Sequence, residues 1–548
     1  MASVKKLGVG NRGLQVVLGR TAAGGSSGTA VLAATILGSS MAFIDGTAVN
    51  VALPTLQAEF RATVVEIQWV VESYLLFLSA LILVGGVLGD RFGRRRIFAS
   101  GTALFAGASV WAGLAPNVDQ LILARAVQGI GGALLVPGSL AMISATFAGE
   151  QHGRAIGTWS AFTAVTMALG PVLGGWFVDH ASWRWVFFIN VPLAMIVLGI
   201  LYWRVPETLD EVSATGVDWW GALLATFGLG SIVYGLIESG HLSLGHAVVI
   251  RAVAIGIVAL IAFIVVEAYS RTPMMPLTLF RSRTFSGANV LTLFLYAALG
   301  GALFFLPFNL IQVQGYSAMA AGAALLPLIL MISLLSQWAG GLEARYGARL
   351  PLTIGPVLAA VGYALLAVPG IGSSYWTTFF PGIAVLGLGM AISVAPLTTA
   401  VMNAVESRHA GLASGINNAV ARMGGLLAIA VLGLVVLTSF NSSLDSRLAS
   451  LELSPAAQHV LEQQRMKLAG AEVPAGLSGE ARETLKQTIA ASFVDSFRLV
   501  MLIAAGLAFL SALTALLTIK GREPAVKTLS TPMSEHPVGD TNSEPRAA

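Results

Sequence analysis

Three charged side chains stand inside long apolar segments of this chain, where a charge is costly. Asp45, Glu72 and Arg125 each lie within a run of mostly apolar residues. On membrane-insertion scales each such residue costs about 2.5–3.5 kcal/mol, so it persists where it is paired, hydrated or functional. A rise of about 1.5 Å per helical residue puts all three at a similar depth, roughly 9–12 Å from the same ends of their segments. Two carboxylates that share one arginine in a dry site can take up and release a proton, so we predict a proton-coupling cluster.

A static salt-bridge network that holds the three segments together is the alternative interpretation of these charges. For Asp45 we favour proton coupling, and for Arg125 a role in tuning it. Glu72 remains open between a second proton site, a contact for cationic substrates and a local compensation for Arg125.

A short loop between two apolar segments carries an acid, several glycines and a basic cluster, and it reads GVLGDRFGRRR. The glycines allow a sharp turn, and the aspartate can accept hydrogen bonds from a helix N-terminus or an arginine. We therefore predict a conformational latch centred on the aspartate. For the end of the basic cluster, simple orientation of the helices by inner-leaflet charge is an equally good interpretation. The predicted latch residues are Gly86, Asp90, Arg91, Gly93 and Arg94.

The composition defines an integral membrane protein. Of the 548 residues, 56% are hydrophobic and only 11% are charged, which cannot form an ordinary water-exposed surface. About 20 apolar residues cross roughly 30 Å of hydrocarbon, and the backbone must be bonded within the segment, so helices are expected. The absence of cysteine excludes disulfides, thiolate metal sites and cysteine-linked lipid anchors. The net charge of +4 indicates topology and not nucleic-acid binding.

The apolar runs predict fourteen membrane-spanning helices. An even number places both termini on one side, and arginines gather in the loops of that side, so we expect both termini in the cytoplasm. This side collects Arg91, Arg94, Arg95, Arg96, Arg154, Arg204, Arg271, Arg281, Arg283, Arg345, Arg349 and Arg408, and the other side holds little beyond Arg61, Arg184 and Arg251. The predicted spans are roughly 29–53, 66–89, 95–115, 119–142, 153–178, 184–204, 217–238, 246–267, 285–312, 318–343, 349–369, 375–402, 410–438 and 492–519.

An internal repeat organises these spans. Residues Gly341 to Arg349 are a degraded copy of the GVLGDRFGRRR loop and lie between spans ten and eleven. The two loops are equivalent if spans one to six form one half and the second half starts at span nine. We therefore predict an all-helical layout of six, two and six spans, with a site near the midplane between parallel halves. The predicted segments are a cytoplasmic segment at 1–28, the N-terminal six-helix half at 29–204, two extra helices and linkers at 205–284, the C-terminal six-helix half at 285–519 with an external loop at about 440–491, and a disordered cytoplasmic tail at 520–548.

Several of these segments resemble the major facilitator superfamily, and within it the fourteen-span drug:proton antiporters. Phe43 to Pro54 is similar to the first-span signature of that group, and Gly86 to Arg96 is similar to motif A of the superfamily. Leu121 to Ala133 resembles motif B. Further similarity is found in Trp183 to Pro192 and in Gly411 to Gly425.

The segment from Gly170 to Gly175 resembles the core of the antiporter motif C. Glycines four residues apart permit close helix approach, and a proline removes a helical hydrogen bond. A hinge or a seal against proton leak is therefore expected at Gly170, Pro171 and Gly174. The glycine usually found four residues before Gly170 is Thr166 here, which weakens the expected tight packing.

The resemblance implies a major facilitator fold and alternating-access export of hydrophobic, often cationic compounds in exchange for protons. It also implies that the Asp90 contact stabilises the outward-facing state. The proton gradient would be the energy source, with no cofactor and no metal. Expected partners are small-molecule substrates, protons and the lipid bilayer of a plasma membrane or bacterial inner membrane, with a periplasmic adaptor protein as a further candidate and no nucleic acid.

Four residues are weaker candidates for substrate contact. Asn309 and Gln312 lie three residues apart in the span equivalent to the first and resemble a cavity lining. Phe43 is an aromatic that could line an apolar pocket. Arg422 lies four residues after Asn418 on one helical face, for which hydrogen bonding between helices is the favoured interpretation.

Other classes of protein fit the chain less well. An ATP-driven pump needs a G-x-x-x-x-G-K-[ST] loop, which does not occur. A membrane enzyme would cluster titratable groups at one membrane face, but the seven histidines are scattered, so we expect no enzyme. The repeat and the buried carboxylates disfavour a channel or scaffold. The remaining alternative is a proton-coupled transporter dedicated to one natural substrate, such as a secreted antibiotic, a fatty acid or a lipid.

Overall fold

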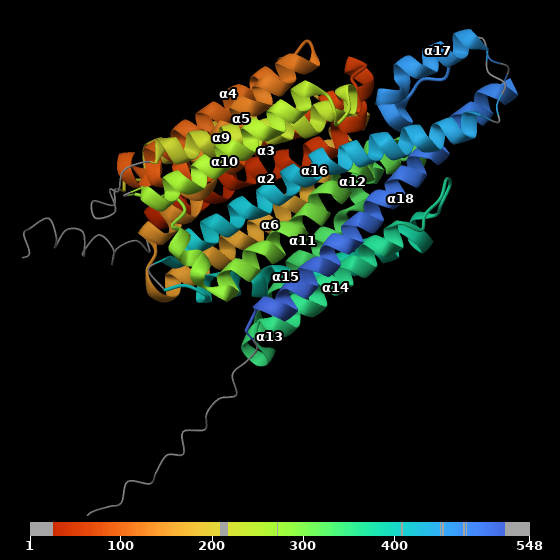
Figure 1. The fold of residues 1–548 in the computed structure, drawn as a ribbon. Coiled ribbons are helices and arrows are strands. Elements are labelled where there is room, and N and C mark those ends of the chain that lie inside the picture. Colours follow the sequence, from red (N-terminus) through yellow and green to blue (C-terminus); the bar gives the residue numbers. More distant parts are fainter. Residues whose placement is uncertain are drawn as a thin grey trace, which may run out of the picture.

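The computed structural model describes residues 26–208, 218–270, 272–406, 409–449, 451, 454–474, 477 and 479–520. Most of the predicted N-terminal segment, nearly all of the predicted tail, and Arg271 and Arg408 lie outside these residues. Within them the chain is a bundle of helices without strands (Figure 1). The described residues include fourteen helices long and apolar enough to cross a membrane, which confirms the predicted number.

The first six spans form one half of the bundle. Its helices are α2 (Ser26–Phe60), α3 (Val64–Phe92), α4 (Arg94–Leu114), α5 (Val118–Thr146), α6 (Gly149–His180), α7 (Trp185–Phe188) and α8 (Asn190–Arg204). α5 packs on α3 and α4, and α2 packs on α5, α6 and α8. The first and last spans of this half therefore share one core.

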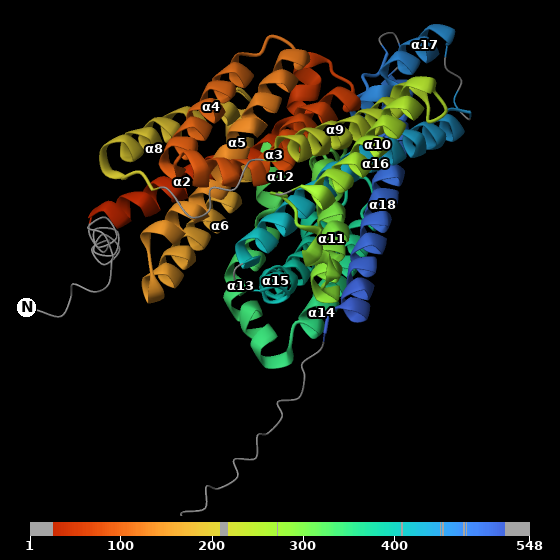
Figure 2. The same cartoon turned by 60° about the vertical axis from the view of Figure 1, so that its left-hand side comes forward.

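The remaining helices form the second half and an extra pair. The pair is α9 (Trp219–Leu242) and α10 (Ala247–Tyr269). The second half contains α11 (Arg283–Phe308), a π-helical turn (Asn309–Val313), α12 (Ala318–Ala324), α13 (Leu326–Tyr346), α14 (Arg349–Leu366), α15 (Phe380–Asn403), α16 (Ala410–Leu448), α17 (Pro455–Gln464), a 3-10 turn (Arg465–Gly470) and α18 (Gly479–Thr518). α11 packs on α16 and α18, while α14 packs on α15 and α18. α9 contacts both α3 and α16, so the extra pair lies against both halves (Figure 2).

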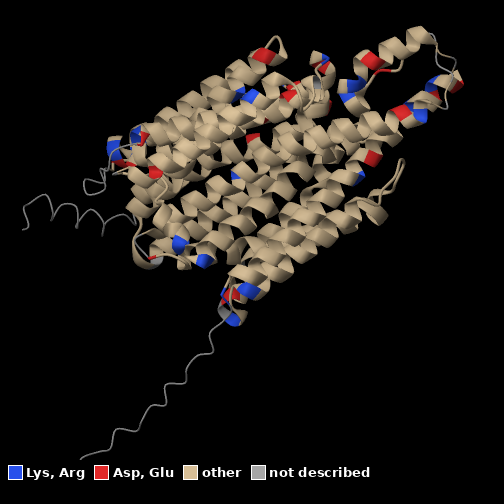
Figure 3. Cartoon of the chain, in the orientation of Figure 1, with Lys and Arg blue, Asp and Glu red and all other residues tan. Residues whose placement is uncertain are grey.

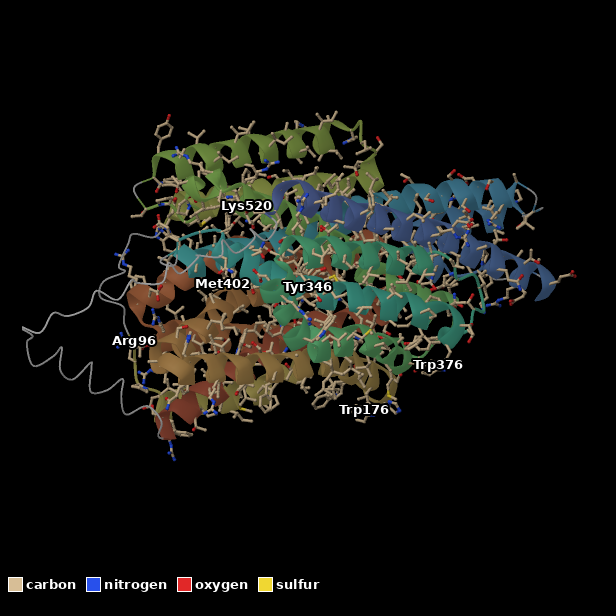
Figure 4. The ribbon with its side chains drawn as sticks, turned by 90° about the horizontal axis from the view of Figure 1, so that it is seen from below. Arg96, Trp176, Tyr346, Trp376, Met402 and Lys520 are labelled. Atoms are coloured by element: carbon tan, nitrogen blue, oxygen red, sulfur yellow. The ribbon has the colours of Figure 1, made fainter. Side chains whose placement is uncertain are left out.

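Charged residues gather at the two ends of the bundle, and few lie between them (Figure 3). We call the end with the α3–α4 turn the arginine-rich end, and the end with α17 the opposite end. Figure 4 shows Arg96 and Lys520 toward the first end and Trp176 and Trp376 toward the second. Both tryptophans are exposed, as is typical of aromatic side chains near a membrane–water boundary.

Local signals in the sequence fix where the helices begin. At the start of α3, the Thr63 hydroxyl accepts a hydrogen bond from the Glu66 amide (3.2 Å), and the Thr63 amide donates to the Glu66 carboxylate (2.7 Å). This reciprocal pair is a capping box and satisfies two free amides. Asn117 caps α5 by accepting from the Gln120 amide at 2.9 Å. Gly93 separates α3 from α4 with φ of +108°, a backbone conformation that favours glycine.

The helices at the opposite end continue beyond the predicted spans. α16 runs to Leu448, past the predicted end at 438, and α18 begins at Gly479, before the predicted start at 492. The buried face of these helices continues through Leu444 and Leu485, which the window of apolar residues does not show. The predicted external loop therefore consists largely of these two helix ends, α17 and the 3-10 turn.

Close helix packing in the first half gives a stability prediction. A Cβ atom on Gly85 of α3 would overlap the Ala133 carbonyl of α5, whereas a Cβ atom on Gly107 of α4 would meet nothing within 4 Å. We expect Gly85→Ala to destabilise the protein by about 1–3 kcal/mol through overpacking, and Gly107→Ala to be neutral or slightly stabilising. Thermal unfolding of the purified protein, followed by size-exclusion fluorescence, checks this. Equal melting temperatures for the two variants would contradict the described α3–α5 contact.

Candidate functional site

The centre of the site is an ion pair between α2 and α5. Asp45 exposes none of its surface and Arg125 only 1%. The Arg125 Nη1 donates to Asp45 Oδ2 and also to Gln128 Oε1 at 2.8 Å. Its Nε donates to the Val70 carbonyl at 3.2 Å. The structure thus brings together two of the three residues of the predicted proton-coupling cluster.

Amide and hydroxyl groups complete the shell around Asp45. Gln128 Nε2 donates to Asp45 Oδ1 at 2.7 Å and to the Ser109 hydroxyl at 3.0 Å. Asn190 Nδ2, at the start of α8, lies 3.4 Å from the same Asp45 oxygen. Sequence analysis did not name these polar residues as part of the site. Gln128 lies within the motif B segment and Asn190 within the Trp183 to Pro192 segment, so the sequence resemblance could have indicated both as site residues.

An aromatic face covers the arginine. The guanidinium carbon of Arg125 lies 4.2 Å from the ring centre of Tyr74 and 5.9 Å from that of Phe187. Such cation–π contact stabilises a cation with few water partners. Arg125 thus has a fixed position, with Asp45 on one side and Tyr74 over its plane.

Glu72 lies apart from this pair. It exposes none of its surface, and neither carboxylate oxygen has a hydrogen-bond partner among the described residues. One helical turn before it, Gln68 donates to the Ile429 carbonyl of α16 (2.8 Å), and one turn after it, Leu76 packs on Gly230 of α9. Glu72 therefore lies on the face of α3 turned toward α9 and α16, and the structure does not bring it to Arg125.

A cavity of about 410 Å³ lies between the two halves. Phe43, Asn50 and Tyr74 line it from the N-terminal half, together with the edge of Arg125. The second half contributes lining residues from α11, α15 and α16. These are Tyr296, Leu299, Gly300, Leu303, Phe304, Val394, Leu397, Thr398, Val401, Ser414, Asn417, Asn418, Ala421, Arg422, Gly425 and Ile429.

The weaker substrate candidates fall into two groups. Phe43 and Arg422 line the cavity, and their contact with substrate remains a prediction. Asn309 and Gln312 are absent from the described lining of this cavity, unlike the expected cavity lining, and substrate contact by either remains a prediction. Asn309 is buried and accepts from Gln314 at 3.2 Å, and Gln312 donates to Gln57 of α2 at 2.8 Å. The π-helical turn shifts the register at this point, so three-residue spacing does not place these side chains toward the cavity.

The predicted latch residues form the α3–α4 turn, which is bonded to other residues of the N-terminal half. Asp90 pairs with Arg94, whose Nη2 and Nε lie 2.8 and 2.9 Å from one carboxylate oxygen. Glu207, which follows α8, accepts from the amides of Arg95 (3.0 Å) and Arg96 (3.2 Å) at the start of α4. A Cβ atom on Gly93 would lie 2.6 Å from the Glu207 carboxyl carbon, so a larger residue would displace this carboxylate in addition to straining φ. Sequence analysis did not name Glu207, because it lies more than 100 residues away in the chain.

Two other latch residues make packing contacts. A Cβ atom on Gly86 would lie 3.9 Å from Pro137 of α5, and the Arg91 guanidinium lies 5.4 Å from the Phe92 ring centre. The hydrogen bonds of Asp90 stay within the N-terminal half. The role of this turn as a conformational latch therefore remains a prediction.

The motif C glycines lie where α6 meets its neighbours. A Cβ atom on Gly170 would overlap the Thr47 side chain, and one on Gly174 would lie 2.8 Å from the Ala48 backbone of α2. Gly175 and Pro171 face α12 of the other half, where a Cβ atom on Gly175 would lie 2.5 Å from Met319 Cα. The predicted close approach is thus present, whereas the hinge or seal remains a prediction.

The halves are held together at the opposite end. Asp179, near the end of α6, accepts from the amides of Ala318 (3.0 Å) and Met319 (2.8 Å) at the start of α12. Gln57 donates to the Lys467 carbonyl of the 3-10 turn at 3.2 Å. Figure 2 shows α6 and α13 diverging toward the arginine-rich end. The described residues therefore have their polar bridges between halves at the opposite end.

Two helical halves around a central cavity, with a buried ion pair at its wall, define a membrane transporter. The chain belongs to the Major Facilitator Superfamily, whose sequence profile matches residues 35–429. Members of this family are transporters and not enzymes.

Two named relatives are similar to this chain over most of its length. The chain is 35% identical over 434 residues to "Multidrug resistance protein Stp" of Mycobacterium tuberculosis (strain CDC 1551 / Oshkosh), which covers 78% of this chain and 80% of that protein. It is 32% identical over 500 residues to "Tetracenomycin C resistance and export protein" of Streptomyces glaucescens, covering 89% and 91%.

The fold is also shared with solved transporters. A bacterial homolog to the human lysosomal transporter Spinster, in an inward-facing and unoccupied conformation, has a TM-score of 0.59 at 18% identity, covering 91% of this chain and 99% of that one. The nucleoside transporter NupG has a TM-score of 0.58 at 12% identity, covering 90% and 100%.

Adjacent asparagines of α16 offer a matched test of the site. Both line the cavity, but Asn417 donates to Thr292 (2.7 Å) and Asn289 (3.2 Å) of α11, whereas Asn418 donates to the Ser414 carbonyl of its own helix. We expect Asn417→Ala to lower stability by about 1–3 kcal/mol, because it leaves buried polar groups unpaired, and Asn418→Ala to preserve it. Thermal unfolding of both purified variants measures the difference. The reverse order of stabilities would overturn these assignments.

Proposed function

We propose that this protein exports small hydrophobic molecules in exchange for protons by alternating access. The observation that carries the proposal is the buried Asp45–Arg125 pair at the wall of a cavity between two halves. A carboxylate held by an arginine changes its partner when it takes up a proton. Transfer of a proton to Asp45 would release Arg125, and the resulting unpaired charge favours rearrangement of α2 against α5.

The orientation of the chain supports export by this cycle. Arg154, Arg204 and Arg349 lie at the arginine-rich end with the α3–α4 turn. By the positive-inside rule we assign this end, and with it both termini, to the cytoplasm of a plasma membrane or bacterial inner membrane. The bridges at the opposite end then close the outer side, and the cavity receives substrate from the cell interior. The cap formed by α17 and the 3-10 turn is the part that a periplasmic adaptor protein would meet.

The names of two relatives bear on the alternative that this protein transports one dedicated natural substrate. One relative is named for resistance to and export of a single compound, tetracenomycin C, and another for multidrug resistance. A growth-inhibition panel in an efflux-deficient host separates the two. Protection against several unrelated compounds indicates a multidrug exporter, and protection against one indicates a dedicated transporter.

The first test of coupling removes the charge of Asp45. In proteoliposomes with an imposed pH gradient, we expect the parent to move a planar dye such as fluorescein only when the gradient is present. Asp45→Asn should reduce gradient-driven movement about tenfold or more while retaining gradient-independent substrate exchange, because binding and rocking remain without proton uptake. Asp119→Asn, which removes the charge of an exposed aspartate at the start of α5, should transport like the parent.

Asp45→Asn leaves Arg125 without its partner, so its folding is checked by size-exclusion chromatography before transport is measured. Normal gradient-driven transport by a folded Asp45→Asn protein would reject Asp45 as the coupling residue. No movement of any compound by the parent would reject gradient-driven export itself.

We further propose Glu72 as a second proton-binding residue, since its carboxylate is buried where α3 faces the other half and has no partner in the part of the chain that the structure describes. An unpaired buried charge is costly, so proton exchange at this position would be linked to movement of α16. We expect Glu72→Gln to transport with fewer protons per substrate molecule. The reversal condition, at which opposing substrate and pH gradients give no net flux, measures this number. An unchanged reversal condition would restrict Glu72 to local packing.

A further inference from the structure

The cavity between the halves contains one cation whose charge is not balanced. Arg422 of α16 lines the cavity, and within the part of the chain that the structure describes its guanidinium has no hydrogen bond and no carboxylate partner. The phenols of Tyr74 and Tyr296 belong to the same cavity lining.

Arg125, the other arginine of the cavity lining, does have a carboxylate partner. Arg125 is neutralised by Asp45, and its Nε and Nη1 donors are occupied by protein acceptors. No aspartate or glutamate belongs to the described cavity lining. The expected preference for cationic compounds therefore has no carboxylate to support it, and the net charge of the described lining comes from Arg422.

The backbone around Arg422 is firmly placed. A Cβ atom on Gly424 would lie 2.7 Å from the Leu293 carbonyl, and one on Gly300 would lie 2.6 Å from Gly425 Cα. These glycines let α16 and α11 touch along their backbones. Asn417, five residues before Arg422, adds two hydrogen bonds to α11. The guanidinium is therefore presented to the cavity from a rigid helix pair.

We propose that Arg422 binds an anionic oxygen group, a carboxylate, phenolate or enolate, on an otherwise apolar and planar substrate. The proposal rests on the export function proposed above and narrows its substrate class. An arginine presents parallel N–H donors that match a carboxylate, and a cation in a poorly hydrated cavity gains most from an anionic partner. Phe43 and Tyr296 supply aromatic surface for the apolar body of the molecule.

This placement separates the two charges of the transport cycle. The proton-binding Asp45 lies on α2 of the N-terminal half, and Arg422 lies on α16 of the other half. Proton and substrate therefore do not compete for one carboxylate, and coupling between them acts through the movement of the halves. Export of a monoanion against proton entry also moves net positive charge inward, so an interior-negative membrane potential drives it.

Binding to the full-length protein in nanodiscs of zwitterionic lipid tests the proposal. Three fluorescent probes share one planar body and differ in charge: 1-pyrenecarboxylate, the neutral 1-pyrenecarboxamide and the cationic 1-pyrenemethylammonium. Equilibrium dialysis against protein-containing and empty nanodiscs gives the dissociation constants. The variants are Arg422→Gln, Arg422→Lys and, as the control for net charge, Arg251→Gln on the exposed face of α10.

The parent should bind the carboxylate most tightly of the three probes. Arg422→Gln should weaken carboxylate binding about 10- to 100-fold and leave the carboxamide within about twofold, since one charge-assisted contact is lost. Arg422→Lys should fall between the parent and Arg422→Gln, because it keeps the charge but not the planar fork. Arg251→Gln should bind like the parent.

Two results would overturn the proposal: tighter binding of the cationic probe than of the carboxylate by the parent, or an equal loss of all three probes in Arg422→Gln. Measuring gradient-driven transport of the same probes distinguishes failure of the Arg422 site from failure of the export function. Selective carboxylate binding without gradient-driven movement would leave the Arg422 site intact and reject proton-driven export. Gradient-driven movement of the cationic probe by both parent and Arg422→Gln would reject the Arg422 site and retain export.

Discussion

The low dielectric constant of the membrane interior constrains the whole N-terminal half through one ion pair. A carboxylate and a guanidinium can stay charged there only if almost every donor and acceptor has a partner. Asp45 and Arg125 meet this condition by using four further groups, the Gln128 and Asn190 amides, the Ser109 hydroxyl and the Val70 carbonyl. These groups come from α3, α4, α5 and α8, so the position of one charge pair depends on the correct assembly of most of this half. A small change at the pair, such as the gain of a proton, therefore affects all of these helices.

The contacts between the halves are of a different kind. They consist of glycines against backbone, as at Gly175 and Met319, and of a few polar bridges such as Asp179 to α12. Such interfaces bury little side-chain surface at each point and lose few strong interactions when they open. The strong electrostatic interactions lie within one half, and the weaker ones lie between halves, which suits a molecule whose halves move as rigid bodies.

Much of the architecture could be predicted from the sequence, because span number and the repeat depend on apolar runs and on copied motifs. The Asp45–Arg125 contact was also predictable, since both charges stand alone in apolar segments at a similar depth. Depth alone does not determine direction around a helix, however. Glu72 shares the depth but lies on the face of α3 turned toward α9 and α16, and pairing in space could not be read from its position in the chain.

Irregular backbone and distant contacts account for the other differences. The π-helical turn at Asn309–Val313 rotates side chains away from the face that regular spacing predicts. Glu207 joins the α3–α4 turn from a segment far along the chain, and no local pattern marks it. The ends of α16 and α18 were misplaced because a window of apolar residues detects the hydrocarbon boundary and not the end of the helix.

The extra pair α9 and α10 makes the two sides of the interface between the halves different, because it covers only one of them. α9 lies across the line where α3 meets α16, with Gly230 against Leu76 and Gly240 against Leu437. Lipid is thereby kept from that seam, while the α6–α13 side has no such cover among the described helices. The two lines along which the halves meet therefore differ in how they are covered, although the halves are related by a repeat.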